Sequence, residues 1–209
     1  MRRERNSVES PDLNARILAT LAWIGVGVQA GASIWLAAHT NWRGAAVMAG
    51  FTVGTIFTLV LRTRLPRLFS LLFVSAGFVN AAGFAWDLFE NENCVWYDEA
   101  AHAYTSLMVA LVISFWMYYG SGRVRPIAVF VTLATLATLG VGIAWEIFEW
   151  LVGILGPPRD TVLDLVMDLV GGVGGALSGA WAIRYCHPEC LVDYEQVEPA
   201  HLQGVLRPG

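Results

Sequence analysis

The stretch "IAVFVTLATLATLGVGIAWEIFEWLVGIL", residues 127–155, carries no charged side chain except Glu146 and Glu149. An α-helix needs about 20 apolar residues to cross the hydrocarbon core of a bilayer. The length and apolar character of the stretch therefore predict a transmembrane helix. Ionisable groups at membrane depth are costly and commonly have a function, so the two glutamates require a partner or a role.

Five further apolar runs predict helices of the same kind. The chain has 209 residues, of which 56% are hydrophobic and 14% are charged, whereas roughly a quarter of the residues in soluble domains are charged. Lipid admits only helices and closed barrels as spanning structures, and runs this long favour helices. The six predicted spans are residues 17–38, 44–61, 68–89, 101–119, 127–155 and 162–183.

We therefore predict an all-α, polytopic membrane bundle of six transmembrane helices. Residues 17–183 are expected to form a single six-span domain between an N-terminal tail, residues 1–16, and a C-terminal tail, residues 184–209. If both tails are cytoplasmic, all but Arg43 and Arg159 of the 13 basic residues lie in inner segments. Inner loops of membrane proteins carry an excess of basic residues, so the N-in, C-in orientation is predicted.

The acidic residues are distributed unevenly. Seven of the 17 lie in the two tails, and all the others fall in outer loops or in the outer halves of the last four spans. Residues three or four apart share one face of a helix. That spacing relates Glu146 to Glu149, Asp98 to His102, and Asp160 to Asp164 and Asp168. We expect these faces to point into the bundle, because the bundle interior is less costly for charge than lipid.

Part of the quoted stretch occurs twice. "GFAWDLFEN", residues 83–91, resembles "GIAWEIFEW", residues 142–150. Each copy leads through a short loop into a predicted helix with an aspartate and a second polar residue four positions later. These pairs are Asp98 and His102 in "DEAAH", and Asp160 and Asp164 in "DTVLD". We interpret this as a parallel duplicated hairpin, repeat A over residues 68–119 and repeat B over residues 127–183, with a pseudo-twofold axis along the membrane normal. The alternative is chance similarity in a chain rich in Trp and Phe.

These acids and one histidine form a candidate metal site. Several carboxylates and an imidazole suit a divalent ion such as Mg²⁺, Mn²⁺ or Ca²⁺, and Fe or Zn is also compatible. Asp160 is equally compatible with a helix N-cap. The predicted ligands are Asp98, His102, Glu146, Glu149, Asp164 and Asp168, with Asp87, Glu90 and Asp160 as weaker candidates.

Two further features of the C-terminal region bear on this prediction. Gly171, Gly175 and Gly179 continue the face of Asp164 and Asp168, and a stripe of small residues lets another helix approach closely. In "CHPEC", Cys186, His187 and Cys190 are compatible with half a metal site or with an ordinary tail.

Three short motifs resemble the YjdF-like family of small multi-span bacterial inner-membrane proteins, and more distantly the VanZ-like proteins. The motifs are Tyr97-Asp98 with His102, Glu146-x-x-Glu149-Trp150, and Asp164-x-x-x-Asp168 followed by glycines. The resemblance covers roughly residues 70–180. It implies a multi-pass protein of the bacterial inner (cytoplasmic) membrane and implies no particular reaction.

Three functions fit these observations. The first is a metal-dependent hydrolase or transferase that acts at the outer leaflet on a lipid or a lipid-linked phosphate. The second is a cation or proton transporter with the acidic cluster as its outer vestibule. The third is a structural or regulatory membrane protein in which a metal only clamps the helices. Membrane lipids are the expected partners and nucleic acid is not; the sequence identifies no protein partner.

Overall fold

The chain folds into six long helices. A computed structural model describes residues 11–60, 68–89, 92–94, 96–121, 126–153 and 156–185, and no strand occurs within these ranges. Each helix is long and apolar enough to cross a membrane, which confirms the predicted all-helical fold. The helices are α1 (Pro11–Ala38), α2 (Trp42–Val60), α3 (Leu68–Ala85), α4 (Tyr97–Ser121), α5 (Ile127–Val152) and α6 (Pro158–Tyr185).

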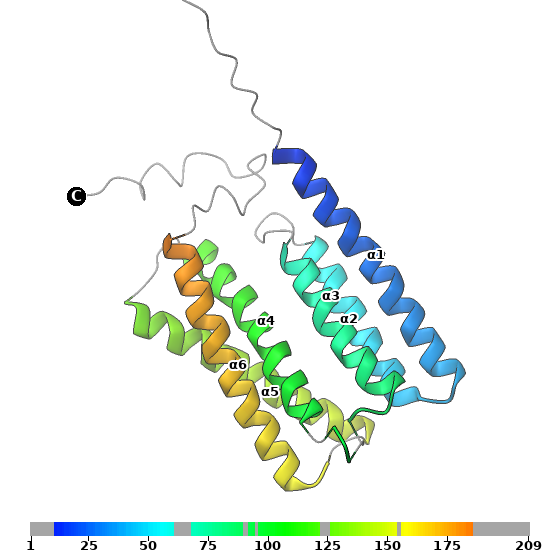
Figure 1. Ribbon diagram of the computed structural model, residues 1–209. Coiled ribbons are helices and arrows are strands. Elements are labelled where there is room, and N and C mark those ends of the chain that lie inside the picture. Colours follow the sequence, from blue (N-terminus) through cyan, green and yellow to red (C-terminus); the bar gives the residue numbers. More distant parts are fainter. Residues whose placement is uncertain are drawn as a thin grey trace, which may run out of the picture.

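Successive helices run in opposite directions (Figure 1). The first residues of α1 and the last residues of α6 therefore lie at the same end of the bundle, and the links α1–α2, α3–α4 and α5–α6 lie at the other end. Helices α1, α2 and α3 pack together, α4 lies beside α6, and α5 runs obliquely behind these two. The site described below is built from the second group.

The outer surface of the bundle is apolar. Ile34 is 71% exposed, Leu151 69% and Val53 66%, which is the surface expected of helices that face lipid. Trp42 and Trp96 are also largely exposed, and they lie at the starts of α2 and α4, at the end of the bundle that carries the α1–α2 and α3–α4 links. Tryptophan favours the membrane–water interface, so these are positions expected of interfacial side chains.

Helices α4 and α6 are parallel and in close contact because of the glycine stripe of α6. A Cβ atom at Gly171 would collide with the carbonyl oxygen of Ala103, and one at Gly175 would lie 2.7 Å from the Cβ of Ala110. A Cβ at Gly179 would lie 2.6 Å from the Cβ of Ser114. The predicted close-approach face is therefore confirmed, with α4 as its partner.

Helix α3 ends earlier than the hydropathy predicted. It stops at Ala85 rather than at residue 89, because Asp87 adopts a left-handed conformation with φ of 55°. The backbone N–H of Leu88 donates to the carbonyl of Gly83, which is the hydrogen bond of a Schellman-type helix end. In the matching stretch of α5 the helix continues, so the two similar sequences fold differently at their acidic residue.

A neutral polar cluster, here called the Gln29 cluster, joins α1, α2 and α3. It consists of Gln29, Thr55, Thr58 and Ser70, and all four side chains are buried. Thr55 Oγ1 donates to Gln29 Oε1 over 3.1 Å, and Gln29 Nε2 donates to the carbonyl of Val74 over 3.4 Å. Thr58 Oγ1 donates to Ser70 Oγ over 3.1 Å. Interhelical hydrogen bonds of this kind hold helices together in lipid.

Candidate metal centre

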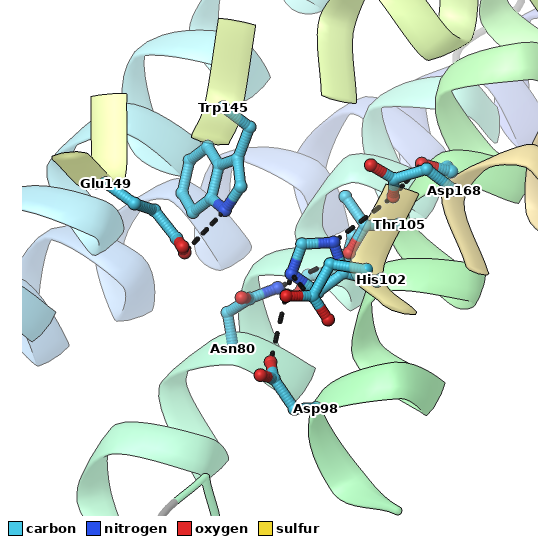
Figure 2. A network of polar contacts seen from close by, with 10 residues as sticks. Asn80, Asp98, His102, Thr105, Trp145, Glu149 and Asp168 are labelled. Atoms are coloured by element: carbon cyan, nitrogen blue, oxygen red, sulfur yellow. Dashed lines mark hydrogen bonds and ion pairs between the residues drawn. The ribbon is translucent and has the colours of Figure 1, made fainter. Parts of the chain in front are cut away.

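Helices α4 and α6 run parallel and in contact, so the helix faces that carry their acidic residues lie together. Asp98 and His102 lie one turn apart on α4, and Asp164 and Asp168 lie one turn apart on α6, so the two pairs face each other across the interface. His102 is the residue between them (Figure 2). It contacts both residues of the α6 pair and also Asp98 on its own helix.

The two ring nitrogens of His102 face different groups. Nε2 lies 3.8 Å from Asp98 Oδ1 and 3.9 Å from Asp164 Oδ1. Nδ1 lies 3.2 Å from Asp168 Oδ1, at hydrogen-bond distance. Because a carboxylate can only accept, this bond places a ring proton on Nδ1. Nε2 is the ring nitrogen that faces Asp98 and Asp164.

Asp98, His102 and Asp164 can hold a metal ion. One ligand atom from each lies within 4.8 Å of the others. The side chain of Asp98 is 31% exposed, that of His102 is 10% exposed and that of Asp164 is 5% exposed, so the group extends from the rim of the bundle into its interior. Two carboxylates and an imidazole are a donor set compatible with Mg²⁺, Mn²⁺, Fe or Zn.

Asp168 is held in place from two sides. Ser106 Oγ donates to its Oδ1 over 2.7 Å, alongside the bond from His102. Its Oδ2 lies against Gly142 of α5, where a Cβ atom would collide with it. Asp168 is 3% exposed, and its Oδ2 has no hydrogen-bond partner within the described part of the chain.

Helix α5 adds the two glutamates of the opening stretch. Trp145 Nε1 donates to Glu149 Oε1 over 2.8 Å, so the indole orients this carboxylate (Figure 2). Glu146 is 6% exposed, and neither of its oxygens has a hydrogen-bond partner among the described residues. Thr161 of α6 approaches Glu146 without meeting the geometry of a hydrogen bond. Glu146 is thus a buried carboxylate with both oxygens available.

The structure treats the weaker candidates differently, and Asp160 is the one that interacts electrostatically with Asp98 and Asp164. Asp87 is exposed in the turn after α3, so the structure does not bring it to the cluster. Asp160 lies in the first turn of α6, with its carboxylate against Gly156, and it is not the N-cap because the helix begins at Pro158. Glu90 and the tail motif of Cys186, His187 and Cys190 lie outside the described residues.

A half-enclosed cavity of about 70 Å³ lies beside His102, and its lining includes Asp168, the bonding partner of Nδ1. Its apolar wall includes Phe51 of α2 and Trp145 of α5. Its polar wall includes Asn80 of α3 and Thr105 of α4, and Asn80 Nδ2 lies 3.4 Å from Thr105 Oγ1. The cavity is also lined by His102, Ser106, Gly142 and Asp168.

Sequence reasoning missed several polar residues of this site. The spacing of four between Trp145 and Glu149 was a usable signal for their hydrogen bond, because both lie on one helix. Ser106 lies four residues after His102, on the same face, so its place beside the histidine could also have been read. Nothing in the sequence linked Asn80 to Thr105, because their contact depends on how α3 packs against α4.

The fold and the site define a class: a polytopic, all-helical membrane protein with carboxylates and one histidine buried near one end of the bundle. A family model described as "Predicted membrane protein (DUF2238)" matches residues 14–185, and the chain belongs to this family. The match extends over all six helices. Comparison with curated proteins found no match, and comparison with solved structures found none.

Proposed function

We propose that the protein is a membrane-embedded, divalent-metal-dependent enzyme whose ion is held by Asp98, His102 and Asp164. The observation that carries the proposal is the arrangement of His102, with Nε2 between two carboxylates and Nδ1 bonded to a third. A metal-binding histidine commonly donates its other N–H to a carboxylate, which fixes the ring and its tautomer. Asp168 supplies that carboxylate, so its role is to position His102 rather than to bind the ion.

The distances between the ligand atoms suit an ion. Ligands that each lie about 2.0 to 2.6 Å from a Mg²⁺ or Ca²⁺ ion are about 3 to 5 Å apart. The separations of 3.8 and 3.9 Å around Nε2 fall in this range. Mg²⁺, Mn²⁺ or Ca²⁺ is the expected ion, with Fe or Zn also compatible. The buried, unpartnered Glu146 and Asp168 Oδ2 add to the demand for positive charge.

For the reaction we propose hydrolysis or group transfer on a lipid or a lipid-linked phosphate. The ion would polarise a phosphoryl oxygen that approaches from the rim, where Asp98 is partly exposed. Glu146 has both oxygens free to accept a proton from an attacking water, which makes it the candidate general base. Glu149, oriented by Trp145, is the neighbouring carboxylate on the same face.

Transport and a purely structural role are less well supported. A cation or proton path built on ionisable groups would need them along its length, yet residues 103–121, 127–145 and 169–183 contain no Asp, Glu, Lys, Arg or His. A purely structural metal would not require a further buried carboxylate with free oxygens, and Glu146 is such a carboxylate among the described residues.

The cellular setting belongs to the same proposal. We infer an N-in, C-in orientation in a bacterial inner membrane, with residues 1–16 and 184–209 as cytoplasmic tails and lipids as partners. The 17–183 domain and the duplication of residues 68–119 and 127–183 also remain proposals. The parallel packing of α4 on α6 supports the duplication, and the different local folds at Asp87 and Glu146 weigh against it. The YjdF-like relationship rests on the motifs alone.

Elemental analysis of the purified full-length protein tests the metal centre. We expect about one equivalent of a divalent metal in the wild type and a clear loss in Asp164→Asn. Asp87→Asn is the matched control, because Asp87 is an exposed acid outside the cluster. A metal-free wild type whose thermal unfolding does not respond to chelators would refute the centre.

Phosphate release from lipid phosphates in mixed micelles tests the reaction. Activity should require the metal, and Glu146→Gln should abolish it while retaining the metal. A fully loaded protein that neither releases phosphate from a lipid phosphate nor transfers a group from one to an acceptor would refute the proposed reaction and leave the metal centre standing.

A further inference from the structure

We propose that the cavity beside His102, which nothing in the reaction above uses, is a binding site for a primary ammonium group. The cavity is lined by residues of α2, α3, α4, α5 and α6, and Asp98 and Asp164 are not among them. A ligand there would therefore not compete with the metal for these two carboxylates. The proposal goes beyond the proposed function and can hold without it.

The charge of the cavity selects a cation. Asp168 lines it, is 3% exposed, and has an Oδ2 atom without a partner among the described residues. No Lys or Arg lies among the described residues that line the cavity. A buried carboxylate oxygen without a donor is unfavourable, and a charged donor satisfies it best. The carboxylate of Asp168 would repel an anion there.

The local excess of acid persists even when one divalent ion is bound. Asp98, Asp164, Asp168, Glu146 and Glu149 all lie near His102. One doubly charged ion offsets two of these five carboxylates. Charges left in a medium of low dielectric constant need further cations or protons. A positive ligand in the cavity is one way to supply such a charge.

The other walls suit an ammonium group rather than a bare metal ion. Trp145 and Phe51 line the cavity, and aromatic side chains attract organic cations. Thr105 and Asn80 add a hydroxyl and an amide on the polar wall, whose oxygens accept N–H bonds. An ammonium group has three N–H donors to share among such acceptors. This combination of one carboxylate, neutral acceptors and aromatic rings fits a primary amine.

The size of the cavity limits the ligand. A water molecule needs about 10 to 15 Å³ of such space, and the cavity measures about 70 Å³. It therefore accommodates a group of a few non-hydrogen atoms, such as an ammonium on a two-carbon stem. The same group occurs in free amines and in lipid headgroups.

Calorimetric titration with ethylammonium chloride tests the proposal. The probe is added to the full-length protein in phosphatidylcholine nanodiscs at constant ionic strength. We expect saturable binding of ethylammonium and none of tetramethylammonium, which has no N–H, or of acetate, which is an anion. Asp168→Asn should weaken ethylammonium binding about tenfold or more, because a charge-assisted hydrogen bond is lost.

Variants that leave the proposed metal ligands intact separate the cavity from the metal centre. Val109→Phe should fill the cavity and abolish binding, whereas Val53→Phe, at a lipid-exposed position, should bind like the wild type. Thr105→Val, of nearly the same shape, should weaken binding without disturbing the fold. Metal content, measured in the same samples, should stay at the wild-type level in all three.

Repeating the titration in phosphatidylethanolamine nanodiscs identifies the source of the amine. Loss of the ethylammonium signal would assign the cavity to the lipid headgroup, and an unchanged signal would assign it to a free amine. The proposal is overturned if tetramethylammonium or acetate binds as well as ethylammonium. It is also overturned if Val109→Phe and Thr105→Val both bind like the wild type. A metal-free protein that still binds ethylammonium would refute only the metal centre.

Discussion

Two buried polar clusters lie in the membrane-spanning part of the molecule, and they differ in whether their polar atoms have partners. In the Gln29 cluster of α1–α3, neutral side chains bond to one another and to backbone carbonyls, and none of their atoms is left without a partner. In the acidic cluster of α4–α6, both oxygens of Glu146 and Oδ2 of Asp168 lack one within the described residues.

The difference distinguishes polar side chains that join helices from polar side chains that need a bound ligand. A buried polar group is stable when its hydrogen bonds are made, and it destabilises the protein when they are not. The Gln29 cluster is complete in the folded chain, so it needs nothing more than the helices that it joins. The acidic cluster is incomplete within the described residues, so a bound cation or a proton is needed to complete it. Four substitutions test this contrast, from the largest expected effect to the smallest.

His102→Ala should lower Mn²⁺ affinity by at least about 100-fold. Loss of the groups that merely orient a ligand already costs about 10- to 100-fold, and this change removes a ligand itself. Titration with Mn²⁺, followed by electron paramagnetic resonance of the free ion, measures the affinity. His39→Ala is the control, because His39 is exposed in the link between α1 and α2. Equal affinities in the two variants would mean that His102 binds no ion.

Gly175→Ala should lower the free energy of unfolding by about 1 to 3 kcal/mol, because the added methyl group has no space between α4 and α6. It should also weaken metal binding, because the packing of α4 against α6 places Asp164 beside Asp98 and His102. Unfolding in mixed micelles measures the stability. Gly140→Ala, with open space around its Cβ, should be neutral or slightly stabilising. A loss of similar size in both variants would argue against close packing at this interface.

Glu146→Gln should raise the stability of the metal-free protein by about 1 to 2 kcal/mol, because it removes a buried charge that has no partner. Thermal unfolding in the presence of chelator measures this. Glu92→Gln, at an exposed loop position, should have no effect. A destabilising Glu146→Gln change would show that Glu146 already has a partner in the folded chain.

Gln29→Leu should have the smallest effect, a loss of about 1 kcal/mol, because interhelical hydrogen bonds in membrane proteins contribute modestly. The Thr55 hydroxyl can then donate to its other acceptor, the carbonyl of Phe51. Metal affinity should not change, since the Gln29 cluster lies in α1–α3. If Gln29→Leu impaired metal binding, the two clusters could not be independent.

Much of the fold could be predicted because hydropathy reports burial in lipid directly. The six apolar runs correspond to the six helices, and the stripe of Gly171, Gly175 and Gly179 predicted a close helix contact that α4 provides. The end of α3 could not be predicted in this way. Asp87 stops the helix through its backbone conformation, whereas its sequence counterpart Glu146 lies inside a continuing helix. Hydropathy is similar in the two stretches, so it cannot distinguish them.

Sequence spacing predicted which candidate residues share a face of one helix. It did not predict which residues of different helices are in contact. Spacing by four related Asp98 to His102 and Asp164 to Asp168. Which of these atoms meet depends on the register of α4 against α6, which spacing does not encode. The division between Asp164, facing Nε2, and Asp168, facing Nδ1, therefore emerged only from the structure.

The parallel course of α4 and α6 has an electrostatic consequence. The N-terminus of an α-helix carries a partial positive charge whose effect fades within about one turn. Both helices present this end to the acidic rim, where Asp98 and Asp160 occupy their first turns. Asp164 and Asp168 lie one and two turns deeper. A cation that enters from the rim would first meet Asp98 and Asp160, whose charges the helix N-termini partly offset. It would then meet Asp164 and Asp168, which lie beyond the reach of that effect.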